Sequence, residues 1–164
     1  MILPESGPAG RGGGILTHVG ESGHARMVDV TSKLPTHRRA VARSVVKLGR
    51  ASQALFSEQS ELLCAARVAG IQAAKQTAEL IPLCHPLGSP ITEITLSVGD
   101  GCIEIESRSE VFGPTGIEME ALTACTVAGL TVLAAVLPSD PDAYVEGLGL
   151  WEKSGGRSGT WVRG

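Results

Sequence analysis

Residues 94–106 read ITLSVGDGCIEIE, and this stretch decides the fold class. Apolar residues alternate with Thr or Ser over residues 94–98, and isoleucines alternate with glutamates over residues 103–106. Gly99-Asp100-Gly101 stands between the two runs, and glycines of this kind suit a tight turn. The pattern therefore predicts an antiparallel hairpin with one face against a core and the other in water.

Helical patterns are predicted on both sides of this hairpin. A first helix is expected after Pro35 and before Gly49, with an apolar stripe formed by Val41, Val45, Val46 and Leu48. A polar loop over residues 57–60 then precedes a second helix over residues 61–80. Pro82 and Pro86 follow and exclude regular helix from the segment between them.

A third, longer helix is predicted after the hairpin. Thr115-Gly116-Ile117-Glu118 matches a capping box, which would open a helix running into the uncharged segment 121–139. That segment is nearly long enough to span a bilayer. A helix that is apolar on every side is also typical of one enclosed by protein, and we favour this interpretation over a membrane span.

These elements predict an α+β fold, with helices packed on one face of an antiparallel sheet. Short strands are expected around residues 148–151 and 160–162. Residues 1–15 are rich in Gly and Pro and predict a flexible arm, so a single domain is expected over residues 16–164.

Composition narrows the classes of function. The 164 residues are 43% hydrophobic but only 3% aromatic, so Ala, Leu, Val and Ile must build a core that oligomerisation would help to bury. A net charge of −3 argues against a nucleic-acid partner. The four cysteines form no CxxC pair and no secretory signal is evident, which predicts a reduced, cytoplasmic protein without a membrane partner.

The segment Leu83-Cys84-His85-Pro86 places an imidazole on a loop between two prolines. Histidine titrates near neutral pH, and a rigid position suits a group that moves protons on a substrate. The alternative is a surface or capping histidine without a catalytic role. Cys84 and His85 lack the spacing of zinc ligands and no second cluster completes a set, so no metal site and no cofactor are predicted.

Two further segments could belong to a site. Glu118 and Glu120 flank Met119, and they are either acid–base groups or favourable charges at a helix entrance. Residues 153–159, KSGGRSG, combine glycines with hydroxyls and with the cations of Lys153 and Arg157. This loop could bind phosphate, although its spacing is not that of a Walker A loop and a plain surface turn is the alternative.

Taken together, these segments resemble the MoaC family, the cyclic pyranopterin monophosphate synthases of molybdenum-cofactor synthesis. The most specific strings are LIPLCHPL at 80–87, TGIEMEALT at 115–123 and KSGGRSG at 153–159. Further matches are LTH at 16–18, MVDV at 27–30 with Lys33, Thr36 and Arg38, and the helix segment 66–75. The likeness extends from about residue 16 to the end of the chain.

The resemblance implies a ferredoxin-like subunit in a homohexamer built from dimers, with pockets at subunit interfaces. It also implies a reaction in which a cyclised GTP derivative rearranges with loss of pyrophosphate. By this analogy the pocket is lined by Leu83, Cys84, His85, Met119 and Glu120. The phosphates would then be held by Lys33, Arg38, Lys75 and Lys153, and Arg157 of the Gly-rich loop is a further candidate for substrate binding.

Three departures from the family pattern bear on this reaction. The family carries an active-site lysine ahead of the second helix, where this chain has Gln59, and a catalytic Asp and a Lys late in the long helix, where it has Ala134 and Leu137. None of these three side chains transfers a proton at neutral pH. Loss of one such group costs on the order of 10²–10⁴ in rate.

Three functions remain open from the sequence. The first is a repurposed cyclase, isomerase or lyase for a small anionic substrate, with His85 as proton shuttle and Glu118 or Glu120 as its carboxylate partner. The second is the family's own synthase reaction with substitute residues. The third is a non-catalytic subunit or ligand-binding paralogue that joins an active relative.

Overall fold

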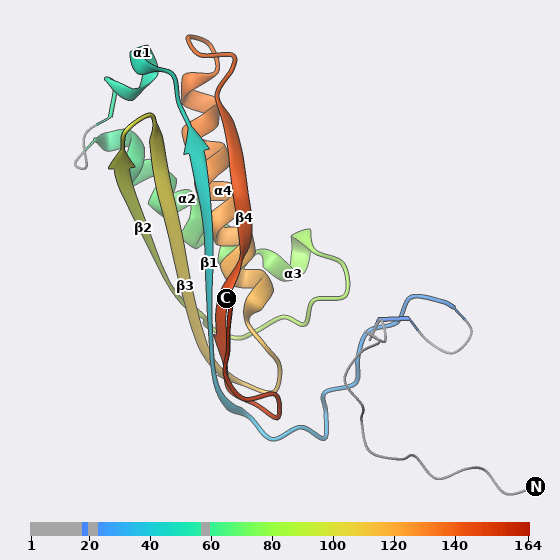
Figure 1. The fold of residues 1–164 in the computed structure, drawn as a ribbon. Coiled ribbons are helices and arrows are strands. Elements are labelled where there is room, and N and C mark those ends of the chain that lie inside the picture. The colour runs from blue at the N-terminus through green and yellow to red at the C-terminus, as the bar shows by residue number, and fades with distance from the viewer. Residues whose placement is uncertain (1–17, 20–22, 57–59) are drawn as a thin grey trace, which may run out of the picture.

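The computed structural model describes residues 18–19, 23–56 and 60–164, and Figure 1 shows the arrangement of their elements. The predicted arm, residues 1–15, and Gln59 lie outside these described residues. Five strands form one sheet: β1 (Thr36–Lys47), β2 (Ile91–Gly99), β3 (Cys102–Gly113), β4 (Tyr144–Ser154) and β5 (Trp161–Val162). The helices are α1 (Arg50–Gln53), α2 (Glu61–Lys75), α3 (Thr77–Leu80) and α4 (Glu118–Val136).

The sheet has the order β2-β3-β1-β4-β5, and every neighbouring pair is antiparallel. The chain order β1–α2–β2–β3–α4–β4 is that of a ferredoxin-like fold. The predicted hairpin is confirmed as β2 and β3, with Gly99 paired to Cys102 across the turn. The expected C-terminal strands are also present, although β4 is longer than predicted.

The helix predicted after Pro35 is wrong, because residues 36–47 form the central strand β1. Ala40, Ala42, Ser44 and Val46 alternate as buried residues on one face of this strand. Val41, on the opposite face, is buried as well, so the strict alternation that marks a strand is obscured. β1 pairs with β3 on one side and with β4 on the other, and this pairing outweighs any local preference of residues 36–47 for a helix.

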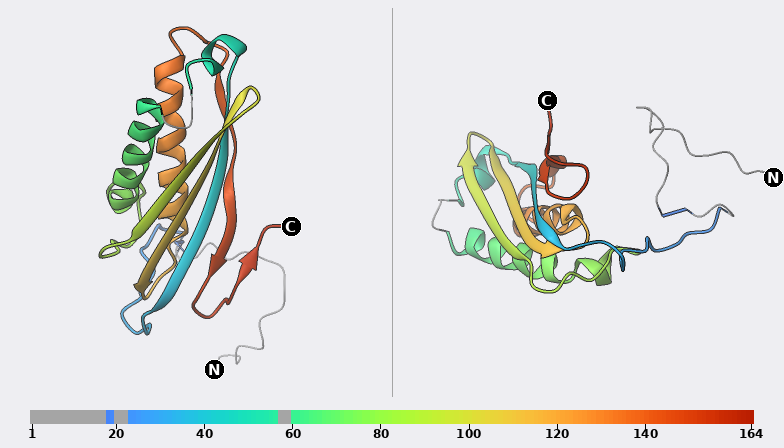
Figure 2. Two further views of the ribbon diagram at one scale, coloured as in Figure 1. Left: turned by 90° about the vertical axis from the view of Figure 1, so that its left-hand side faces the viewer. Right: turned by 90° about the horizontal axis from the view of Figure 1, so that it is seen from below.

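The helices α2 and α4 cover one face of the sheet, as the two views of Figure 2 show. The predicted second helix is confirmed but is divided at Gln76, where α2 ends and α3 follows. Ser60 caps α2 by accepting a hydrogen bond from the backbone N–H of Leu63 at 3.3 Å. Between these helices and the sheet lies a core of small and branched residues, among them Ala66, Ala124, Ile103 and Ile105.

The predicted long apolar helix is confirmed as α4. By length and composition it could cross a membrane, but half of its most apolar window is buried against the rest of the protein. The capping box predicted at its start does not form: Ile117 is the N-cap residue and makes no side-chain capping hydrogen bond. The carboxylate of Glu118 is instead bound by Lys153 of β4.

Candidate active site

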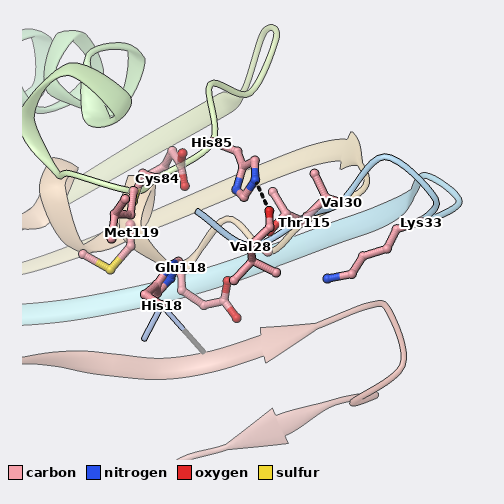
Figure 3. A pocket seen from close by; sticks show the side chains of 12 residues that line it. His18, Val28, Val30, Lys33, Cys84, His85, Thr115, Glu118 and Met119 are labelled. Atoms are coloured by element: carbon pink, nitrogen blue, oxygen red, sulfur yellow. Dashed lines mark hydrogen bonds between the residues drawn. The ribbon is translucent and has the colours of Figure 1, made fainter. Parts of the chain in front are cut away.

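Two adjoining cavities lie where the start of α4 meets the loop after α3 and the segment before β1 (Figure 3). The smaller, which we call the acidic cavity, has a volume of about 270 Å³. Its lining is His18, Val28, Val30, Lys33, Leu83, Cys84, His85, Thr115, Gly116, Glu118, Met119 and Glu120.

The larger, which we call the basic cavity, has a volume of about 890 Å³. Its lining is Asp29, Ser32, Lys33, Leu34, Thr36, Arg38, Pro114, Thr115, Gly116, Gly156, Arg157 and Ser158. Lys33, Thr115 and Gly116 line both cavities, so a ligand with a ring and a phosphate group could occupy the two together.

The fold brings most of the predicted site residues to these two cavities. Lys153 reaches the same place by donating a hydrogen bond from Nζ to Glu118 Oε1 at 3.2 Å. Lys75 does not join them, because it lines a third cavity of about 120 Å³ between α2, α3 and the loop 86–90. Glu120 lines both this third cavity and the acidic cavity, so Lys75 lies on the other side of Glu120.

Glu120 is the most deeply buried charged residue of the site, with only 5% of its surface exposed. Burial raises the pKa of its carboxyl group to about 7, and the nearby charge of Glu118 acts in the same direction. Burial also raises the pKa of the Cys84 thiol, with a smaller contribution from Glu120. A carboxyl group with a pKa near neutrality can both donate and accept a proton at physiological pH.

His85 is fixed by a backbone contact rather than by a carboxylate. Its Nε2 lies 2.7 Å from the carbonyl oxygen of Val28, and Figure 3 shows this hydrogen bond at the edge of the acidic cavity. Leu83, two residues earlier, has a φ of 67°. A left-handed conformation is costly for leucine, which indicates that the surroundings hold this loop in place.

Arg38 is the central cation of the basic cavity. Its Nη2 donates a hydrogen bond to the carbonyl oxygen of Pro114 at 3.3 Å, and its Nε is buried without a partner. The turn that contains Gly155 and Gly156 packs against it, so closely that a Cβ on Gly156 would overlap Arg38 Nη1. A buried N–H without a protein acceptor is suited to an anionic ligand.

Several lining residues are not among the site residues predicted from the sequence, for example His18, Val28, Asp29, Thr115 and Gly116. All five stand in strings that carry the resemblance (LTH, MVDV and TGIEMEALT), which is the signal that could have identified them. A Cβ on Gly116 would overlap the Glu118 carboxylate, so a side chain at this position would displace that carboxylate. Among the described residues, no three His, Cys, Asp or Glu side chains are grouped as metal ligands would be.

Ala134 and Leu137 lie near the C-terminal end of α4, and both are exposed. A helix rises about 1.5 Å per residue, so Ala134 stands roughly 20 Å along the axis from Glu120. Within one chain these two positions therefore belong to neither cavity.

Comparisons with known proteins show the family of this chain. The model of the MoaC family matches residues 27–156. A cyclic pyranopterin monophosphate synthase of Thermomicrobium roseum is 51% identical over 90% of this chain and 93% of its own length. The cyclic pyranopterin monophosphate synthase of Novosphingobium aromaticivorans is 45% identical over 89% of this chain and 96% of its own length. Cyclic pyranopterin monophosphate synthase 2 of Mycobacterium bovis is 42% identical over 96% of this chain and 97% of its own length. The chain belongs to the MoaC family.

Proposed function

We propose that this protein is a lyase of the cyclic pyranopterin monophosphate synthase type, with a cyclised GTP derivative as its substrate. The observation that carries the proposal is the junction of the acidic and basic cavities at Lys33, Thr115 and Gly116. Loss of pyrophosphate from a ring system needs proton donors at the ring and fixed cations at the leaving group. The two cavities supply these groups side by side.

In this proposal the ring occupies the acidic cavity, beside Glu120 and His85. Glu120 exchanges protons with the ring, because its pKa of about 7 leaves both protonation states populated. Glu118, held by Lys153 at 3.2 Å, is a fixed acceptor for ring N–H groups. The hydrogen-bond partner of His85 is a backbone carbonyl rather than a carboxylate, so its role as a proton shuttle stays a prediction.

The phosphates occupy the basic cavity. Lys33, Arg38 and Arg157 would neutralise the negative charge that develops on pyrophosphate as it leaves. The Nε of Arg38 is a buried donor with no hydrogen-bond partner among the described residues, so it could donate to a phosphate oxygen. Lys75 lies in the third cavity and has no place in this arrangement.

A second candidate is the repurposed enzyme, a cyclase, isomerase or lyase for another anionic substrate. The aliphatic side chains of Ala134 and Leu137 favour it, because they stand where the family pattern has an Asp and a Lys. A non-catalytic ligand-binding paralogue would account for the same substitutions. Both candidates retain the two cavities and differ from the first in what happens to the bound ligand.

The assembly and compartment are also proposals. We expect a homo-oligomer, a hexamer built from dimers, in the cytoplasm. Exposed apolar side chains along α4, including Leu130 at 50% and Leu137 at 41% exposure, provide surface for such contacts.

The deciding experiment incubates the purified protein with the cyclised GTP derivative and measures pyrophosphate and pterin product. Release of both supports the synthase, and Glu120→Gln should then lower the rate by about 10²–10⁴. Binding by calorimetry without turnover supports the non-catalytic paralogue. Absence of both binding and turnover contradicts the synthase proposal and favours another substrate.

A further inference from the structure

Residues 23–35, which we call the strap, run over the acidic cavity before the chain enters β1 (Figure 3). Val28, Val30 and Lys33 are its half-buried residues, and all three line that cavity. The remaining strap residues are exposed. The strap therefore covers the cavity with three side chains and otherwise lies in solvent.

Hydrogen bonds within the strap give it a local shape. The carboxylate of Asp29 accepts hydrogen bonds from the backbone N–H and the hydroxyl of Thr31 at 2.9 and 2.7 Å. The backbone N–H of Lys33 donates to the carbonyl oxygen of Val30 at 3.0 Å. These contacts order the strap internally but do not attach it to the domain.

The attachment to the domain is made by His85. Across the described part of the chain, the 2.7 Å contact between His85 Nε2 and Val28 O is the one hydrogen bond that joins the strap to any element after it. Val28 and His85 are 57 residues apart in sequence. The loop that carries His85 is itself constrained by Pro82, Pro86 and the left-handed Leu83. A rigid donor thus holds the strap, and no second hydrogen bond to a later element is present within residues 23–56 and 60–164.

The chemistry of this contact defines the state of the imidazole. A carbonyl oxygen only accepts, so Nε2 must carry the proton and donate it. In the neutral ring Nδ1 then holds a lone pair and is the nitrogen left for a ligand. While the strap is in place, the Nε2 proton is engaged with Val28 and is not free for transfer to a substrate.

We propose that His85 is a positioning residue that clasps the strap over the acidic cavity through its Nε2–H donor. Release of the clasp frees Val28 and Val30 from the cavity wall and moves Lys33, which lines both cavities. The clasp itself is independent of the reaction. Its effect on ligand binding, through Lys33, rests on the proposed function of the two cavities.

Limited proteolysis tests the clasp without any substrate. Trypsin cleaves after Arg26 and Lys33, both of which lie in the strap. His85→Ala should accelerate cleavage at these sites about fivefold, the change expected from loss of one hydrogen bond. His85→Gln keeps an N–H donor at nearly the same reach but cannot shuttle a proton, and should be cleaved within twofold of the natural protein. His37→Ala, on the exposed end of β1, is the control and should leave the rate unchanged.

Cleavage of His85→Ala at the natural rate, or of His85→Gln as fast as His85→Ala, would overturn the proposal. A second measurement needs no variant: nitrogen NMR of the neutral imidazole should show a protonated Nε2 and an unprotonated Nδ1. The opposite tautomer would also overturn the clasp. Inorganic pyrophosphate should slow strap cleavage in the natural protein. If pyrophosphate does not slow cleavage, while the proteolysis of the variants and the NMR spectrum agree with the clasp, the clasp is supported and the proposed role of the basic cavity is wrong.

Discussion

The carboxyl group of Glu120 has the most altered chemistry in the site. Its folded pKa of about 7 lies above the ordinary value of 4.5, because burial disfavours the charged form. The folded state therefore keeps a proton that the unfolded chain loses between these two values. Stability conferred by this proton is fully present below pH 4.5 and is lost as the pH rises to about 7.

Glu120→Gln removes this titration, because an amide stays neutral. We expect the variant to gain about 1–2 kcal/mol in free energy of unfolding, relative to the natural protein, between pH 4.5 and pH 8. Urea denaturation at several pH values measures the difference. Glu104→Gln, at an exposed position of β3, is the control and should show a flat difference. A flat difference for Glu120→Gln would contradict a raised pKa.

At the residue scale, the sequence predicts candidate site residues but not the atoms that they contact. His85, Glu118 and Glu120 were found from loop and helix signals, and all three line one cavity. The partner of His85 is a backbone carbonyl 57 residues away, which has no side-chain signature. Lys75 was grouped with the phosphate cations, but the turn of α2 places it behind Glu120.

At the scale of elements, the contact between α2 and α4 depends on a glycine. A Cβ on Gly70 would overlap Ile94 Cδ1 and stand 2.7 Å from the carbonyl oxygen of Ala124. By contrast, a Cβ on Gly129 of α4 would meet its nearest atoms at 3.5 Å or more, an ordinary contact. The two buried helical glycines therefore differ in the space around them.

Gly70→Ala should destabilise the protein by about 1–3 kcal/mol, because overpacking outweighs the better helix propensity of alanine. Gly129→Ala is the matched control and should be neutral or stabilising by up to about 1 kcal/mol. Thermal or urea unfolding of the two variants measures both effects. Equal effects of the two changes would show that the helices separate to admit the methyl group.

The turn between β4 and β5 also depends on a glycine, which lets the backbone lie close to Arg38. Gly156 has a φ of 70°, and a Cβ there would overlap Arg38 Nη1. Gly156→Ala should displace the guanidinium and weaken pyrophosphate binding about tenfold, the loss typical of one charge-assisted hydrogen bond. Gly159, with a φ of 64° and open space around it, gives the control, because its change to alanine adds strain alone. Calorimetry measures both, and similar affinity losses would remove the assigned role of Gly156.

Among elements, β1 is where sequence-based prediction failed. Its valines recur at helical spacing, and the buried Val41 hides the alternation that its neighbours Ala40 and Ala42 otherwise show. The hairpin and α4 were found because they are continuous in sequence and their patterns are local. A central strand is stabilised by partners more than fifty residues away, which a local pattern does not record.

For the whole molecule, the small aromatic content and the exposed apolar positions of α4 point to assembly. Leu130→Glu should yield a smaller species than the natural protein in light scattering after size exclusion, because a charge on a buried contact costs several kcal/mol. Leu55→Glu, at an exposed position after α1, provides the comparison. A natural protein that is already monomeric, or a Leu130→Glu variant of unchanged size, would contradict assembly through α4.

The sequence by itself determined the fold class, the hairpin, the apolar helix and the family, because these depend on local periodicity and on strings of specific residues. It also predicted candidate acid–base and cationic side chains, most of which line the two adjoining cavities. Only the tertiary structure decided how they are arranged: β1 as the central strand, Glu118 paired with Lys153, and His85 bound to Val28. Each of these depends on segments that are distant in the chain and meet only after the sheet and helices have packed.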